Sequence, residues 1–172
     1  MIKALLLDLG DTLFDTVKKT LFPGVEDALR VLQTFETQDG KPLFTGLVSN
    51  YTMPEPRTAE AIATLFAEYL QILDEIGLRS FFAPAEQRVT LSTTVGVRKP
   101  DKAIFEAALA RGGIAGSLAD VLFITEEADH IAACRKLGMT ALQFGLDFKA
   151  WSAAPLLIAQ TIGVPKNSER AR

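Results

Sequence analysis

Two aspartates follow an apolar run close to the N-terminus, in the stretch LLLDLGDTLF (residues 5–14). Asp8 and Asp11 are three residues apart and flank Gly10. A carboxylate that ends a buried strand can act as a nucleophile, as a general acid or base, or as a ligand for Mg²⁺. Chemistry at Asp8 is therefore the first hypothesis. The second question is whether Asp11 stands where it can take part.

Polar residues also end other apolar runs of the chain. Ser49 and Asn50 follow LFTGLV (residues 43–48), and Thr125 and Glu126 follow DVLFI (residues 120–124). In doubly wound α/β folds, functional sites lie at the carboxyl ends of the strands. Polar residues at the ends of several runs are stronger evidence for a site than any single residue is. They predict one site that these strand ends share.

The elements that must position these residues alternate between two patterns. Short apolar runs, typical of parallel strands covered on both faces, occupy residues 2–7, 43–48, 120–124 and 139–145. Stretches with helical periodicity occupy residues 24–35, 57–77, 99–113 and 128–138. The alternation predicts an α/β fold: a Rossmann-like, doubly wound three-layer sandwich with a mainly parallel central sheet. We expect a single domain over residues 1–164 and a frayed polar tail over residues 165–172.

Composition limits the classes of function. The chain has 172 residues, a formal net charge of −3 and a pI near 5.2, so it carries no footprint for nucleic acid. Its one cysteine, Cys134, cannot form an intramolecular disulfide. The apolar run before Asp8 is too short for a signal peptide or a membrane span. We expect a cytoplasmic protein without a membrane partner, and a homo-oligomer stays open.

In order and spacing, these stretches resemble the four motifs of the haloacid dehalogenase-like (HAD) hydrolases over roughly residues 1–145. Asp8-Leu9-Gly10-Asp11-Thr12 is similar to the D-x-D-x-T motif, and Ser49 ends the second motif strand. Lys99 stands in VGVRKPDKAIFEAAL (residues 95–109), which is similar to the third motif. The stretch VLFITEEADHIAACRKLGMTAL (residues 121–142) resembles the fourth. The resemblance implies a Rossmann-like hydrolase, most commonly a Mg²⁺-dependent phosphatase.

The resemblance also implies roles for individual residues. Asp8 is the expected nucleophile, which forms an aspartyl phosphate, and Lys99 offsets charge between Asp8 and a phosphorylated substrate. Thr12, Ser49 and Asn50 are expected to bind the phosphoryl group.

Mg²⁺ is the expected cofactor. Its expected ligands are Asp8, the backbone carbonyl of Gly10, Glu126 and Asp129. Glu127 remains a candidate because the register of the fourth motif is uncertain by one residue.

Two positions depart from the family pattern. The phosphatases carry their second aspartate, which protonates the leaving group and then activates water, where this chain has Gly10. Asp11 is one residue late, so it either takes over part of this catalytic role or caps the following turn, and the second interpretation is favoured. In the fourth motif, Glu126 aligns with the usual first aspartate and His130 with the second.

The chain shows no obvious cap domain, so we expect a capless or minimally capped member. An open site suits a macromolecular phosphorylated substrate. Two other functions stay open. One is a catalytically degenerate binding or regulatory protein, which Gly10 favours. The other is a metal-independent, haloacid dehalogenase-type hydrolase, against which the acid-rich TEEAD (residues 125–129) counts.

Overall fold

A five-stranded parallel sheet forms the centre of the computed structural model, which describes residues 1–163. Its strands are β1 (Ala4–Leu7), β4 (Phe44–Ser49), β5 (Val89–Leu91), β6 (Val121–Thr125) and β7 (Thr140–Gln143), in the order β5-β4-β1-β6-β7. All four pairings in this sheet are parallel. The predicted α/β fold with a parallel central sheet is confirmed. The tail expected over residues 165–172 lies outside the described residues.

The strand order of the sheet reverses at β1. From β1 the chain adds β4 and then β5 on one side, and it returns to add β6 and β7 on the other. Leu7 at the end of β1 pairs with Leu47 of β4 and with Ile124 of β6. Such a switch point opens a crevice at the carboxyl ends of the strands, and Asp8 follows directly after it.

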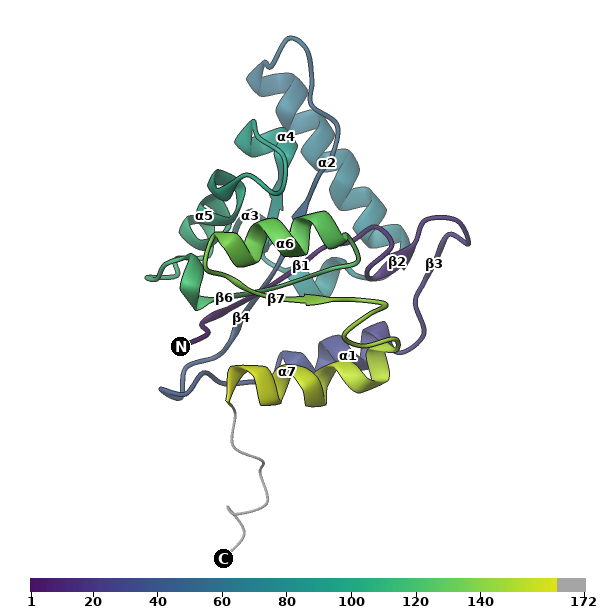
Figure 1. Ribbon diagram of the computed structural model, residues 1–172. Helices are drawn as coiled ribbons and strands as arrows, with labels where there is room; N and C mark the ends of the chain where they lie inside the picture. The colour runs from purple at the N-terminus through teal and green to yellow at the C-terminus, as the bar shows by residue number, and fades with distance from the viewer. Residues whose placement is uncertain (164–172) are drawn as a thin grey trace, which may run out of the picture.

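Helices cover both faces of the sheet (Figure 1). One face packs against α1 (Val25–Leu32), α2 (Ala59–Glu75) and α7 (Ala154–Ile162), and the other against α5 (Lys102–Arg111) and α6 (Ala128–Lys136). Successive strand residues point to opposite faces. Leu5 and Leu7 of β1 therefore join the first core, whereas Ala4 and Leu6 join the second. This arrangement is the predicted three-layer sandwich.

Several short elements were not predicted. They are the antiparallel hairpin of β2 (Phe14–Asp15) and β3 (Thr20–Leu21), the helical turns η1 (Arg79–Phe82), α3 (Ala85–Arg88), α4 (Ser92–Val95), η2 (Leu118–Asp120) and η3 (Trp151–Ala153), and the edge strand β5. Elements of two to four residues are too short to show a period, so the sequence gives no signal for them.

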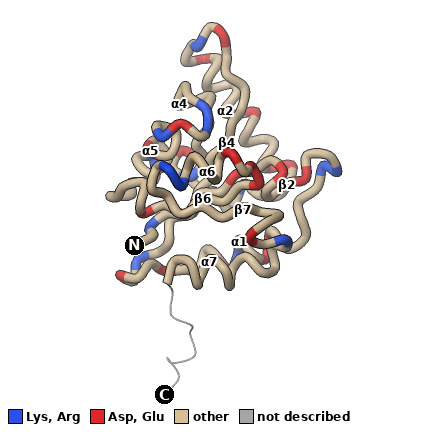
Figure 2. The backbone as a smooth tube through the Cα atoms, in the orientation of Figure 1, with Lys and Arg blue, Asp and Glu red and all other residues tan. Residues whose placement is uncertain are grey.

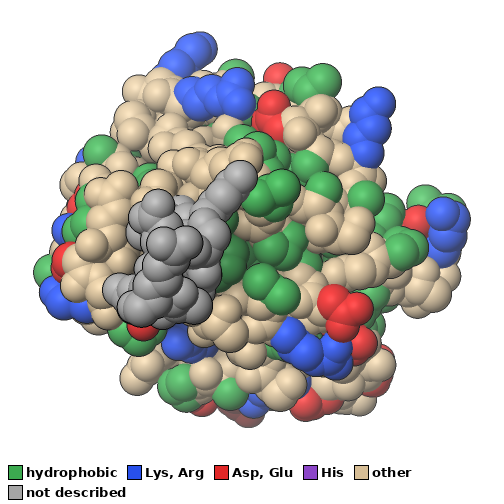
Figure 3. Space-filling view, turned by 90° about the horizontal axis from the view of Figure 1, so that it is seen from below, with side chains coloured by type: hydrophobic (Ala, Val, Ile, Leu, Met, Phe, Trp, Pro, Cys, Tyr) green, Lys and Arg blue, Asp and Glu red, His purple; other side chains and the backbone are tan. Residues whose placement is uncertain are grey.

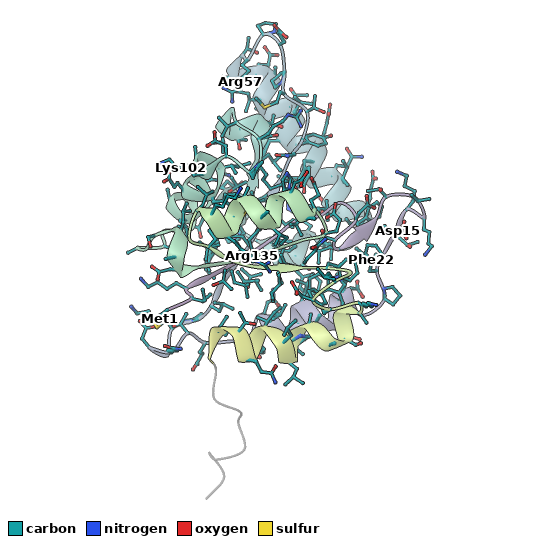
Figure 4. The ribbon with its side chains drawn as sticks, in the orientation of Figure 1. Met1, Asp15, Phe22, Arg57, Lys102 and Arg135 are labelled. Atoms are coloured by element: carbon teal, nitrogen blue, oxygen red, sulfur yellow. The ribbon has the colours of Figure 1, made fainter. Side chains whose placement is uncertain are left out.

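The long helix α2 packs on the sheet with only part of its length. Tyr69 and Leu73 are its buried residues, and its N-terminal half projects away from the sheet in Figure 1. Arg57, labelled in Figure 4, anchors the loop before α2, because its Nη2 donates a hydrogen bond of 2.8 Å to the carbonyl oxygen of Thr93 in α4. The helix is thus held as a wall beside the strand ends.

The outer face of α1 and α7 is the lower face of the molecule. Seen from below, it shows hydrophobic side chains between charged and polar ones (Figure 3). Val31 on α1 is 45% exposed and Leu156 on α7 is 58% exposed. Isolated apolar side chains of this kind are ordinary on protein surfaces. Within residues 1–163, no helix is both long and apolar enough to cross a membrane.

Candidate active site

A cavity of about 340 Å³ opens where β1, β4 and β6 end. Its lining includes the sequence-predicted residues Asp8, Gly10, Asp11, Ser49, Asn50, Lys99, Glu126 and Glu127, together with Leu9, Phe14, Thr16, Tyr51, Tyr69 and Ile72. Acidic positions gather in the same region, between the labels of α6 and β2 in Figure 2. The structure therefore brings most of the predicted residues to one place.

Asp8 lies at the floor of this cavity in a buried ion pair. The Nζ of Lys99 is 2.6 Å from Oδ2 of Asp8, and their side chains are only 1% and 9% exposed. Thr125 donates its hydroxyl to the same Oδ2 over 3.0 Å, and the backbone N–H of Leu9 donates to Oδ1 over 2.8 Å. Buried charges of this kind are tolerated when they are paired and hydrogen-bonded. The carboxylate is thus held in one orientation.

Asn50 positions the loop that carries Lys99. Its Oδ1 accepts a hydrogen bond of 2.7 Å from the backbone N–H of Lys99, and its Nδ2 donates to the Lys99 carbonyl over 3.3 Å. Both functions of the amide are therefore engaged by the backbone. Asn50 differs in this respect from the expectation that it contacts a phosphoryl group.

Ser49 is joined to a residue that the sequence did not single out. The Ser49 hydroxyl lies 2.7 Å from the hydroxyl of Tyr69 on α2, and Tyr51 packs edge-to-face on Tyr69 with ring centroids 5.2 Å apart. Burial raises the pKa of the Tyr69 hydroxyl, which keeps it protonated. In the sequence Tyr69 looks only like an inward-facing helix residue, because the hydroxyl end of its side chain leaves no periodic signal.

Asp11 is committed to the turn that follows it. Its Oδ1 accepts hydrogen bonds from the Thr16 backbone N–H over 2.9 Å and from the Thr16 hydroxyl over 2.6 Å. Its own backbone is left-handed, with φ of 50°. Asp11 borders the cavity, but its carboxylate is hydrogen-bonded to Thr16, at the start of the loop between β2 and β3. This is the geometry of a turn cap rather than of a free acid.

Thr12 connects two motif loops from behind the cavity. Its hydroxyl donates to Oε2 of Glu126 over 2.5 Å and accepts from the Glu126 backbone N–H over 3.1 Å. Thr12 is fully buried and is not part of the cavity lining, unlike the phosphoryl-binding position expected for it. Burial raises the pKa of the Glu126 carboxyl.

Comparison with known proteins rests on structure. No protein-family model matches the chain, and no curated protein matches it. A HAD-superfamily hydrolase from Ehrlichia chaffeensis superposes with a TM-score of 0.67 and 16% identity over 94% of this chain and 99% of that one. L-2-haloacid dehalogenase from Xanthobacter autotrophicus superposes with a TM-score of 0.61 and 15% identity over 94% and 84%. The putative HAD-hydrolase YfnB from Bacillus subtilis, solved bound to magnesium, superposes with a TM-score of 0.51 and 15% identity over 86% and 89%.

The chain has the fold of the HAD-superfamily hydrolases. The HAD fold places the end of β1 at the centre of the sheet, where Asp8 lies. Mg²⁺ takes oxygen ligands in near-octahedral geometry. The Asp8 and Glu126 carboxylates and the Gly10 carbonyl are oxygen donors, and all three residues line the cavity. The donor chemistry of these residues therefore fits the ion.

The fourth-motif acids do not all reach the cavity. Asp129, expected as a metal ligand, is exposed in the first turn of α6 and does not line the cavity. Instead, Asp8, Glu127 and His130 offer ligand atoms that all lie within 4.8 Å of one another. The sequence left Glu127 open as a candidate and aligned His130 with the second aspartate of the fourth motif.

Proposed function

We propose that this HAD-fold protein is a phosphatase that cleaves a phosphate monoester through an aspartyl phosphate on Asp8. The observation that carries the proposal is the buried pair of Asp8 and Lys99, 2.6 Å apart at the floor of a cavity. A fixed carboxylate beside a fixed ammonium suits the attack of one anion on another, because the ammonium offsets the combined negative charge.

The reaction divides into two steps. An Asp8 oxygen forms a bond to phosphorus while the ester bond to the alcohol leaving group breaks, and water then cleaves the aspartyl phosphate to release phosphate. The Lys99 ammonium offsets the negative charge of Asp8 and the phosphoryl group. The Ser49 hydroxyl exchanges its hydrogen bond with Tyr69 for one with a phosphoryl oxygen. Asp8, the Gly10 carbonyl and Glu126 would hold Mg²⁺, which when bound supplies further positive charge between the two anions.

The residues that line the cavity indicate a class of substrate. Phe14 from the hairpin and Tyr51, Tyr69 and Ile72 from the α2 side line the space around Asp8. Apolar and aromatic walls around a few polar groups are typical of small-molecule sites. We therefore propose a compact phosphate ester with an apolar or aromatic leaving group, ahead of the macromolecular substrate that an open site would favour.

The test uses p-nitrophenyl phosphate, which has an aromatic leaving group. We expect the full chain to release p-nitrophenol only when Mg²⁺ is present, and Asp8→Asn to reduce the rate to background. Asp74→Asn, which changes an exposed acid on α2, is the matched control and should keep the wild-type rate. Turnover that survives Asp8→Asn, or no turnover with any phosphate monoester tried, contradicts the proposal.

A dehalogenase is the second candidate. The superposition on L-2-haloacid dehalogenase favours it, together with the absence of an acid at position 10. Chloride release from a 2-chloro acid without added metal, lost in Asp8→Asn, would support this reaction in place of phosphatase activity.

A further inference from the structure

We propose that Asp8, Glu127 and His130 form a binding site for a borderline first-row cation such as Zn²⁺. This ligand set differs from the all-oxygen set of Asp8, Gly10 and Glu126 in its imidazole. The inference goes beyond the proposed function, because it concerns a second ligand set that shares only Asp8, and binding itself needs no phosphate ester and no turnover.

The spacing of the ligand atoms fits a single ion. Ligand atoms of the three residues lie within 4.8 Å of one another, and Nε2 of His130 is 3.3 Å from Oε2 of Glu127. Two ligands that bind one ion at about 2.0–2.1 Å and a tetrahedral angle apart are themselves about 3.3 Å apart. Glu127 is 48% exposed, so its side chain is free to close the remaining distance to Asp8.

The buried imidazole of His130 distinguishes this cluster from a group of surface acids. Its side chain is 9% exposed, and its Nδ1 is buried without a hydrogen-bond partner among residues 1–163. A neutral imidazole carries an N–H on one nitrogen and a lone pair on the other. A bound ion takes the lone pair of one nitrogen, and the proton then stays on the other.

The fold explains why these residues meet. Glu127 is the N-cap of α6 and His130 lies three residues later, so both side chains fall on one face of the helix. β6, which leads into α6, pairs directly with β1, which leads into Asp8. The Lys99 ammonium and the Thr125 hydroxyl both bind Oδ2 of Asp8, whereas Oδ1 accepts from the Leu9 backbone N–H and keeps a second lone pair for a cation.

The imidazole decides which ion is favoured. Mg²⁺ prefers oxygen ligands and retains its waters, whereas imidazole suits Zn²⁺ and its neighbours in the first row. We therefore expect metal-stripped protein to bind one Zn²⁺ per chain, with a higher affinity than for Mg²⁺. Added Co²⁺ should give visible absorption bands, which report the coordination of the ion directly.

The experiment is a calorimetric titration with Zn²⁺ and, separately, with Mg²⁺. His130→Gln and Glu127→Gln are each expected to weaken Zn²⁺ binding at least about tenfold, while His130→Gln leaves Mg²⁺ binding within about twofold of wild type. Glu60→Gln, which changes an exposed acid in the first turn of α2, is the matched control and should bind as wild type does. Circular dichroism checks that each variant is folded, and the exposed Glu127 keeps the test valid if His130→Gln does not fold.

Zn²⁺ binding that is unchanged in Glu127→Gln and His130→Gln overturns the inference, and so does wild-type protein that binds no Zn²⁺. These outcomes are distinct from failure of the phosphatase. Tight Zn²⁺ binding without turnover of any ester would contradict only the proposed function. Turnover with Mg²⁺ and no Zn²⁺ binding would contradict only this inference.

Discussion

At the scale of single residues, Gly10 places no carboxylate at a position that lines the cavity. A Cβ added at Gly10 would meet Cγ2 of Thr16 at 3.5 Å, an ordinary van der Waals contact, and the backbone there does not have a positive φ. Neither space nor conformation therefore requires glycine at this position. The nearest acid along the chain, Asp11, is held by Thr16. If the site is a phosphatase, its weakest function is general acid–base catalysis.

Restoring an acid at position 10 should raise activity. Because a positioned acid typically contributes about 10²–10⁴-fold, we expect Gly10→Asp to increase kcat on p-nitrophenyl phosphate by up to about 100-fold. Gly10→Asn has a similar size but no proton to transfer, so it serves as the control and should give no increase. Steady-state kinetics with Mg²⁺ measure both. A Gly10→Asp rate no higher than that of Gly10→Asn would show that proton transfer does not limit the reaction.

At the scale of elements, α2 takes part in the site through one hydroxyl. Tyr69 is 3% exposed and shares its hydrogen bond with Ser49 at the end of β4. A helix that otherwise covers the sheet thereby fixes the rotamer of a candidate substrate-binding serine. On this side, Tyr69 and Ile72 of α2 line the cavity.

Removing the Tyr69 hydroxyl should destabilise the fold modestly. Tyr69→Phe leaves the buried Ser49 hydroxyl without this partner, so we expect a loss of about 1 kcal/mol in the free energy of unfolding. Ser49→Ala combined with Tyr69→Phe should cost less than the sum of the single changes, since both partners are then absent. Urea unfolding of the four proteins gives the coupling. Strict additivity would mean that the hydrogen bond contributes nothing to stability.

The turn before β6 should make stability depend on pH. Oδ2 of Asp120 accepts hydrogen bonds of 3.1 Å from the Ser117 backbone N–H and from Lys3. The Ser117 hydrogen bond is the main reason that the pKa of Asp120 lies below its usual 3.8, and Lys3 adds to it. A lowered acid pKa stabilises the fold above the unfolded-state pKa, and this contribution is lost as the pH falls through the folded-state pKa.

Asp120→Asn should therefore reduce stability at pH 7 by less than about 1 kcal/mol, because the ion pair is near the surface. The difference from wild type should stay constant down to pH 5 and shrink below pH 4. Thermal unfolding of both proteins across this range measures it. A difference that grows on acidification would reverse the assigned direction of the pKa shift.

At the scale of the whole molecule, the C-terminal part of the described chain returns to support the loop that follows β1. Trp151 is fully buried, and its Nε1 donates a hydrogen bond of 2.7 Å to the carbonyl oxygen of Thr12. Its ring packs edge-to-face on Phe148, with centroids 5.3 Å apart. Through Thr12 the same support reaches Glu126. The position of the first motif thus depends on residues more than 130 positions away.

Trp151→Phe should disturb both stability and the site. The Thr12 carbonyl loses its donor, so we expect a loss of about 1–3 kcal/mol in the free energy of unfolding. Urea unfolding is followed by circular dichroism, because Trp151 is the single tryptophan of the chain. Leu156→Ala, at a position on α7 that is 58% exposed, is the control and should change stability little. Equal effects of the two changes would rule out a specific role for the Trp151 hydrogen bond.

Most of the fold and part of the site follow from local patterns in the sequence. Apolar runs and helical periods predict the strands β1, β4, β6 and β7 and the helices between them, because burial on two faces leaves a direct trace in residue types. The same logic predicts that Asp8, Ser49 and Glu126 lie at one edge of the sheet. It does not predict β5 or the hairpin, which are too short to show a period.

By itself, then, the sequence determined the layered α/β architecture and, through its resemblance to the HAD hydrolases, predicted that Asp8 and Lys99 share one site. Only the tertiary structure decided which way each neighbouring side chain points. Thr12 turns to Glu126 behind the cavity, whereas Tyr69 and His130 turn toward the cavity side. The physical reason is that pairing partners lie up to 139 positions apart, and that adjacent residues of an extended segment project to opposite sides.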